Sequence, residues 1–258
     1  MKRILVYIVL TLLVLGYAAA AIGQEDPLKA KVAVIENAYK GGNLPTLIEK
    51  YEGLAAGNPT DATSRYLLGV AYLYADFDKD NATFDKAFNE FTKAKELDPK
   101  MKYVNNSLAY VFWARGQYDK AIESYKAEIA LDPNNGWNYY SLGQAYEGLK
   151  QWDKAISQYI MATDKEKKDP RIAKAYNNLG TLYMNWSGDY FKALDNFTKA
   201  VQLKPNVTLY RENYNKAVKK LKALKESLDK GTTSLPPETV EKLRKMELKE
   251  IEIGTEGA

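Results

Sequence analysis

The sequence predicts an all-α fold, a solenoid of helix-turn-helix hairpins that ends in a C-terminal capping helix. Three observations predict it: residue types recur every 34 residues, a turn residue separates two apolar segments in each copy, and several copies close with a proline. The recurring positions are Ala87, Ala121 and Ala155; Phe91, Tyr125 and Tyr159; Leu108 and Leu142; Phe112 and Tyr146; and Pro99 and Pro133. The period favours an array of hairpins over one irregular helical bundle.

Turn and packing chemistry justify each part of the unit. Gly116 can take the left-handed conformation that ends the first helix, and Asp119 is expected to cap the second. Small residues such as Ala109 and Ala121 let the two helices approach each other, while aromatic rings fill the space beside them. A proline such as Pro133 disfavours helix at the residue before it and so breaks the chain before the next hairpin.

The unit is clearest in residues 106–125, which read NSLAYVFWARGQYDKAIESY, and it closes with Leu131, Asp132 and Pro133. This pattern resembles the tetratricopeptide repeat (TPR) family. The resemblance implies a right-handed superhelical arrangement of the hairpins and a concave groove lined by their first helices. It also implies a function in binding proteins or peptides.

The repeat and the flanking composition divide the chain into consecutive segments. These are a signal peptide or membrane anchor (1–23), a degenerate repeat (28–61), a repeat with a long turn (62–101), three further repeats (102–135, 136–172 and 173–206), a capping helix (207–230), and a linker, short helix and tail (231–258). The last repeat carries one extra residue near Ser187. The short helix is expected from Glu238 to Glu250, with Pro237 in its first turn.

Residues 1–23 predict export. Lys2 and Arg3 precede an apolar run from Ile4 to Leu15, and small residues precede Gln24, as in a cleavable signal peptide. The stretch from Ile4 is also nearly long enough to serve as an uncleaved membrane anchor. In both cases the basic end stays inside, so we expect a periplasmic body, soluble or attached to the inner membrane.

Composition excludes several chemistries. The chain has no Cys and no His, which rules out disulfides, thiolate nucleophiles, Ser-His-Asp relays, and zinc or haem sites built on those residues. We expect no cofactor. The formal net charge is only +4, of which Lys2 and Arg3 contribute two, so nucleic acid is not an expected partner.

The resemblance places certain first-helix positions on the concave groove. The candidate partner-binding residues are Tyr66, Tyr74, Tyr103, Asn106, Tyr110, Trp113, Trp137, Tyr140, Gln144, Asn177 and Thr181. Aromatic rings give contact area at low entropy cost, and amides can satisfy the backbone of an extended peptide. The alternative is that several of the rings pack on neighbouring repeats instead. The Lys that some family members use to hold chaperone tails is missing at the fifth position of the repeats.

Two other features carry weaker predictions. The turn from Asp76 to Asn81 spaces three carboxylates as the start of a calcium loop does, but the expected glycine and closing glutamate are absent. The capping helix is rich in lysine, which suits an anionic surface or simply complements the helix dipole.

We therefore expect a non-catalytic protein-interaction scaffold of the cell envelope that binds a protein or peptide. One alternative is a membrane-anchored accessory subunit of an envelope complex. Another is a carboxylate-dependent glycoside hydrolase, for which Glu147 is the one clear acid on the expected groove and a second acid is missing. The sequence does not predict the oligomeric state.

Overall fold

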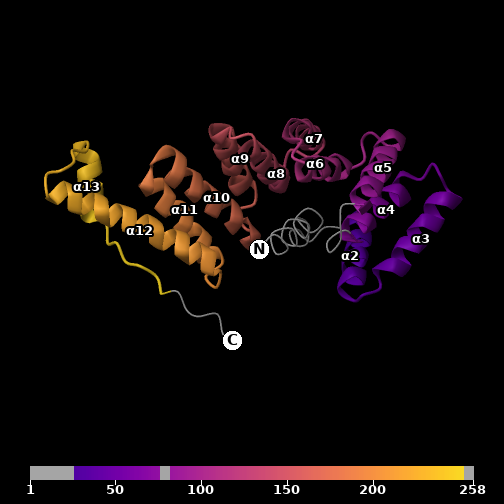
Figure 1. Cartoon of the computed structure of the whole chain (residues 1–258), viewed down its shortest axis with the longest axis horizontal. Helices are drawn as coiled ribbons and strands as arrows, with labels where there is room; N and C mark the ends of the chain where they lie inside the picture. The colour runs from indigo at the N-terminus through magenta and orange to yellow at the C-terminus, as the bar shows by residue number, and fades with distance from the viewer. Residues whose placement is uncertain (1–25, 76–81, 253–258) are drawn as a thin grey trace. The chain divides into compact units, whose positions relative to one another are not determined.

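The computed structural model describes residues 26–75 and 82–252, and within these ranges every regular element is a helix (Figure 1). The all-α repeat fold is confirmed. The expected leader and the expected calcium turn lie outside the described residues. No helix in the described part of the chain is both long and apolar enough to cross a membrane.

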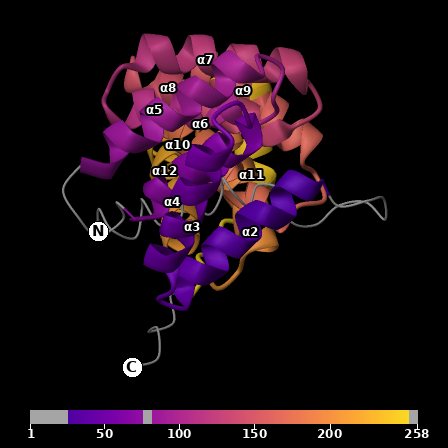
Figure 2. The ribbon, with the colours of Figure 1, turned by 90° about the vertical axis from the view of Figure 1, so that its right-hand side faces the viewer.

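The helices fall into two compact units that meet in the sequence between Gln151 and Trp152. The first unit contains α2 (Pro27–Lys40), α3 (Leu44–Gly57), α4 (Ala62–Ala75), α5 (Ala82–Leu97), α6 (Val104–Ala114), α7 (Tyr118–Leu131) and α8 (Gly136–Gly148). Consecutive helices pack as hairpins, and α2, α3 and α4 lie side by side in Figures 1 and 2. One apolar core runs from Val32 to Val111.

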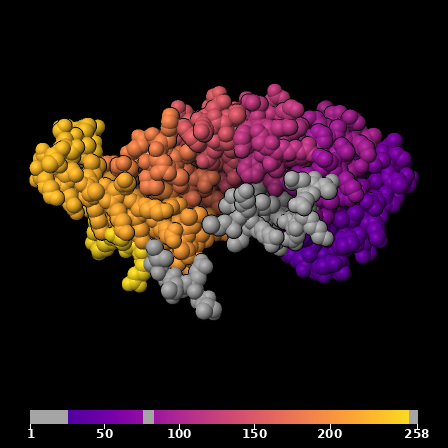
Figure 3. All heavy atoms as spheres, in the orientation of Figure 1, coloured from indigo at the N-terminus to yellow at the C-terminus, as the bar shows by residue number. Residues whose placement is uncertain are grey.

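The second unit contains α9 (Trp152–Lys165), the short helix η2 (Pro170–Ile172), α10 (Ala173–Leu182), the π-helical turn η3 (Tyr183–Ser187), α11 (Tyr190–Leu203), α12 (Thr208–Asp229) and α13 (Pro237–Lys245). Its core includes a cluster centred on Phe197, Val218 and Leu221. Figure 3 shows α12 and α13 joined in one continuous surface.

The two helices of a hairpin touch where a small residue faces a buried ring. A Cβ atom added at Gly69 would come within 2.6 Å of the Phe91 ring, and one added at Gly180 would come equally close to Phe197. Both rings are fully buried. A side chain at either glycine would therefore force the helices apart.

Glycine ends the first helix of the hairpin as predicted, because Gly116 has φ 72°. The predicted cap at Asp119 is wrong. Helix α7 begins at Tyr118 after Gln117, so Asp119 lies inside the first turn, where its charge still favours the helix dipole. In the last repeat an aspartate does cap the helix, since Asp189 accepts a hydrogen bond of 2.9 Å from the Lys192 N–H.

The extra residue in the last repeat is absorbed at the end of its first helix. There the chain widens into the π-helical turn η3 before Gly188 ends it with φ 66°. A π turn accommodates one inserted residue without breaking the helix. The hairpin contact between Gly180 and Phe197 is thereby kept.

The C-terminal helix is shorter than predicted, because α13 ends at Lys245 instead of Glu250. The Asn215 side chain donates to the Ile251 carbonyl at 2.7 Å and accepts from the Ile251 N–H at 2.8 Å. The Tyr214 hydroxyl also donates to the Lys249 carbonyl at 3.2 Å. These bonds satisfy the backbone of a non-helical segment, which returns along α12 and covers it.

A buried carboxylate holds the start of α6. Glu128, on α7, is 0% exposed and accepts a hydrogen bond of 2.6 Å from the Tyr103 N–H. Burial raises the pKa of Glu128 above its ordinary value, although hydrogen bonds from Tyr103, Asn105 and Asn106 act in the opposite direction. Glu128 thus occupies a position at which the neighbouring repeats have the small residues Ala94 and Ala162.

We expect Gly180→Ala to lower the free energy of unfolding by about 1–3 kcal/mol, because its Cβ overlaps the Phe197 ring. Gly53→Ala is the matched control: Gly53 lies inside α3 with nothing near its Cβ position, so alanine should stabilise by about 0.5–1 kcal/mol. Urea unfolding measures both. Equal effects of the two substitutions would contradict the steric account.

We expect the stability of the wild type to fall relative to Glu128→Gln as the pH rises from about 4 to 7. A folded-state pKa above the unfolded value means that the folded chain holds the proton more tightly, so stability is lost as the pH rises through the folded pKa. Urea titrations across this range measure the difference. Parallel curves for the two proteins would show that Glu128 does not titrate differently on folding.

Candidate partner-binding surface

The candidate residues lie on the first helices of the hairpins. In the first unit, Tyr66 and Tyr74 lie on α4, Tyr103 precedes α6, Asn106, Tyr110 and Trp113 lie on α6, and Trp137, Tyr140 and Gln144 lie on α8. In the second unit, Asn177 and Thr181 lie on α10. The first unit therefore brings the aromatic candidates together on α4, α6 and α8.

Most of these side chains are buried. Those with at most 7% of their surface exposed are Tyr66, Tyr74, Tyr103, Asn106, Tyr110, Trp137, Tyr140 and Asn177. Trp113, Gln144 and Thr181 are half-buried. The partner-binding assignment stays a prediction, and these last three side chains are its most accessible members.

The rings pack against each other and against second helices. Tyr66 lies 5.6 Å from Phe91, and Tyr110 lies 6.3 Å from Phe84, measured between ring centroids. Tyr110 also stacks on Trp113 at 6.1 Å. The alternative noted from sequence, that rings pack on neighbouring repeats, therefore describes Tyr110, whereas Tyr66 packs within its own hairpin. Trp113 is the accessible end of the stack with Tyr110.

Burial changes the acidity of two tyrosine hydroxyls. Burial raises the pKa of both Tyr66 and Tyr103, and the nearby carboxylate of Asp26 raises both further. The Tyr103 hydroxyl donates to Asp26 at 2.6 Å, and Asp26 also accepts from the Leu28 N–H and so caps α2. Burial acts to raise the pKa of Asp26, but these hydrogen bonds and the charges of nearby lysines hold it below its ordinary value. The start of α2 is thereby fixed to the start of α6.

Amide side chains pair between the first helices α6 and α8, and between the first helix α10 and the capping helix α12. In the first unit the Asn106 Nδ2 group donates to Asn138 Oδ1 at 3.0 Å, and in the second the Asn213 Nδ2 group donates to Asn177 Oδ1 at 2.9 Å. Within the described chain, Asn106 Oδ1 and Asn138 Nδ2 are buried and make no further hydrogen bond. One acceptor and one donor of this buried pair are therefore unsatisfied within the described chain.

Sequence reasoning missed the partners in these pairs. Asn138 and Asn213 do not occupy the groove positions that the resemblance supplies, so no signal marked them beyond their residue type. Glu128 was missed for a different reason, because it replaces a small residue at a packing position. Only the packing of neighbouring helices shows what each of these side chains contacts.

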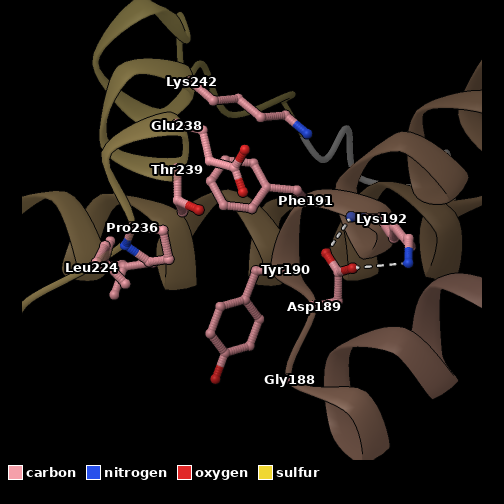
Figure 4. Close-up of a pocket in the computed structure, with 11 residues that line it drawn as sticks. Gly188, Asp189, Tyr190, Phe191, Lys192, Leu224, Pro236, Glu238, Thr239 and Lys242 are labelled. Atoms are coloured by element: carbon pink, nitrogen blue, oxygen red, sulfur yellow. Dashed lines mark hydrogen bonds and ion pairs between the residues drawn. The ribbon is translucent and has the colours of Figure 1, made fainter.

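The second unit also contains a cavity of about 670 Å³ that sequence reasoning did not predict (Figure 4). Its walls come from the start of α11, from Leu224 of α12 and from α13 with the loop before it. Phe191 lies inside, and Lys242 places its Nζ atom 4.6 Å from the centre of that ring. The cavity exists because α13 folds back on α11 and α12, which no local pattern predicts.

The described residues contain no group of three or more acidic side chains arranged to hold a metal ion. The turn from Asp76 to Asn81, for which calcium was considered, is not among them. Its calcium assignment stays untested.

The repeat geometry agrees with comparisons to protein families. Residues 109–150 match a model described as TPR repeat, and residues 173–207 match one described as tetratricopeptide repeat. These two stretches of the chain are tetratricopeptide repeats. No curated protein matches it.

Solved structures share the repeat fold. MamA (residue 41 to the end) from Desulfovibrio magneticus RS-1 is 23% identical over 72% of this chain and 99% of its own, with a TM-score of 0.57. YrrB, described as a TPR protein with an unusual peptide-binding site, is 20% identical over 70% and 88%, with a TM-score of 0.53. Pseudomonas aeruginosa pilF is 21% identical over 65% and 72%, with a TM-score of 0.55. At these identities the likeness shows the fold alone.

The pKa of Lys174, a half-buried residue of α10, can be measured as a test of the structure. Burial, together with the charge of Lys204, lowers the pKa of Lys174 to about 8. Between this value and the ordinary one the unfolded chain holds more protons, so stability should rise with pH in that window. We expect an NMR titration of the methylated lysine to show a midpoint of about 8, raised in Lys204→Met. A midpoint of about 10.4, the ordinary value, would contradict this.

Proposed function

We propose that this protein is a non-catalytic scaffold of the cell envelope that binds an extended segment of a partner protein along the first helices of its repeats. Tetratricopeptide repeats support a protein-interaction role, and such repeats typically serve as scaffolds rather than enzymes. The peptide groove, the envelope location and the attachment of residues 1–23 to a membrane are parts of this proposal.

The observation that carries the proposal is the set of aromatic candidates on α4, α6 and α8, of which Trp113 is half-buried and the others are buried. The amide side chain of Gln144 on α8 is half-buried as well. A row of rings with one accessible tryptophan suits the apolar side chains of a bound peptide. The half-buried Gln144 of α8 adds an amide that can both donate to and accept from a peptide backbone.

A contact within the chain supports the proposal by showing how an asparagine can bind a non-helical segment. Asn215 uses its amide to donate to and accept from the backbone of Ile251, at 2.7 and 2.8 Å. An asparagine on the capping helix α12 can therefore form both backbone hydrogen bonds of one residue in a non-helical segment. The likeness to YrrB, whose description names a peptide-binding site, agrees with the same use.

The test is a peptide-display selection against the full-length chain, followed by affinity measurements on the selected peptides. We expect Trp113→Ala and Gln144→Ala each to weaken binding about tenfold or more, since each removes a contact worth about 1–3 kcal/mol. Leu97→Ala is the control, because Leu97 lies at the end of α5 and is 41% exposed. Circular dichroism confirms that each variant keeps its helicity.

Unchanged affinity in both variants would remove the first-helix surface as the binding site. The location is tested separately, by fractionation and by sequencing the N-terminus of the mature protein. Recovery in the cytoplasmic fraction would overturn the envelope assignment, while retention of Met1 would favour the anchored accessory subunit over a cleaved, soluble form.

A further inference from the structure

Two tryptophans of the second unit, the half-buried Trp152 and the exposed Trp186, form an aromatic pair outside the candidate groove. Trp152 is the first residue of α9, and Trp186 lies in the π-helical turn η3. Their ring centroids are 6.2 Å apart, with an angle of 47° between the planes. Trp186 is 55% exposed, the highest value among the large hydrophobic side chains of the described residues.

The position of Trp186 follows from the extra residue in its repeat. The π-helical turn takes up that residue and changes the angular position of the side chains that follow it. Gly188 then ends the turn with φ 66°. Single π turns inside α-helices frequently mark functional sites, and this one carries the most exposed large apolar side chain of the unit.

A carboxylate completes the cluster formed by Trp152, Asp153 and Trp186, which we call the tryptophan cluster. The Trp186 Nε1–H group donates to Asp153 Oδ1 at 3.4 Å. Asp153 is exposed, and no lysine or arginine of the described residues forms an ion pair with it. The carboxylate therefore lies beside the rings without a counterion from the described chain.

The rings of the tryptophan cluster carry no lysine in the described part of the chain, in contrast to other rings of the same unit. Lysines of the chain lie over Tyr176, Tyr183 and Phe191, at 5.6, 5.3 and 4.6 Å from the ring centres. Within the residues that the structure describes, none lies over Trp152 or Trp186. Tryptophan has the ring face that attracts cations most strongly, so the best cation-binding faces of this unit are the ones left open.

We propose that the tryptophan cluster binds the guanidinium group of an arginine on a partner polypeptide. Guanidinium stacks flat on an aromatic face and at the same time donates two parallel hydrogen bonds to a carboxylate, and the cluster provides both. A lysine ammonium is compact and strongly hydrated, which makes it a poorer match to a ring face. A quaternary ammonium has no N–H for Asp153. The site deepens the proposed scaffold function and rests on it, as a second contact with the partner.

The probe is the peptide acetyl-Gly-Gly-Arg-Gly-Gly-amide, compared with the same peptide carrying citrulline, a neutral isostere of arginine. Four tryptophans give four indole N–H resonances in the full-length chain, and substitutions assign them. We expect the arginine peptide to shift the resonances of Trp152 and Trp186 in a saturable way, with at least tenfold weaker binding of the citrulline peptide.

Variants locate the site. Trp186→Ala should abolish the shift of the Trp152 resonance, and Asp153→Asn should weaken binding about tenfold, the equivalent of losing one charge-assisted contact. Ile160→Ala is the matched control, because Ile160 is 41% exposed on the same helix and lies outside the cluster. It should bind the arginine peptide as the wild type does. Trp186 is exposed, so its removal leaves the packed core intact.

Equal affinity for the arginine and citrulline peptides would overturn the proposal, and so would unchanged binding in Trp186→Ala. The groove is tested by different substitutions, Trp113→Ala and Gln144→Ala, and with display-selected peptides. A failure confined to the arginine peptide therefore rejects the tryptophan cluster and leaves the scaffold function standing, while a failure confined to the selected peptides rejects the groove.

Discussion

The close approach of two helices at a residue without a side chain is the contact on which the rest of the structure depends. At Gly69 and Gly180 the facing phenylalanine ring occupies the volume that a Cβ atom would need. Because protein interiors are close-packed, such a contact fixes the distance between the two helices of a hairpin within narrow limits. With that distance fixed, the first helices of successive hairpins lie side by side, and their equivalent positions gather on one face of each unit.

Packing helices so closely buries their ends, and the chain satisfies the buried polar groups with side chains from neighbouring elements. Glu128 accepts the Tyr103 N–H at the start of α6, and asparagines pair between neighbouring helices in both units. Buried donors and acceptors are costly when unpaired, so these bonds are a condition of the close packing. The end of the array follows the same rule, because the segment after α13 satisfies its backbone with Asn215 of α12.

The many aromatic side chains serve two purposes that depend on their surroundings. Rings such as Tyr66 and Phe91 fill the space between helices and are fully enclosed. Trp113 lies at the edge of this packing, and Trp186 is carried outside it by an inserted residue that the hairpin contact does not need. Aromatic side chains therefore stay accessible at the edge of the packed helices, as Trp113 does, and where an inserted residue interrupts the repeat, as at Trp186.

The sequence by itself determined the all-α repeat fold, the glycine turn at Gly116 and the helix breaks at the prolines, because these are local constraints that each copy of the repeat imposes again. It also identified the small residues and rings of the hairpin contact, which recur at a fixed spacing. Only the tertiary structure decided that α13 ends at Lys245, that Asn106 pairs with Asn138, and that Tyr110 is buried while Trp113 stays accessible. Those outcomes depend on which atoms of other helices come within contact distance, and a repeat pattern specifies the position of a residue on its own helix but not what faces it.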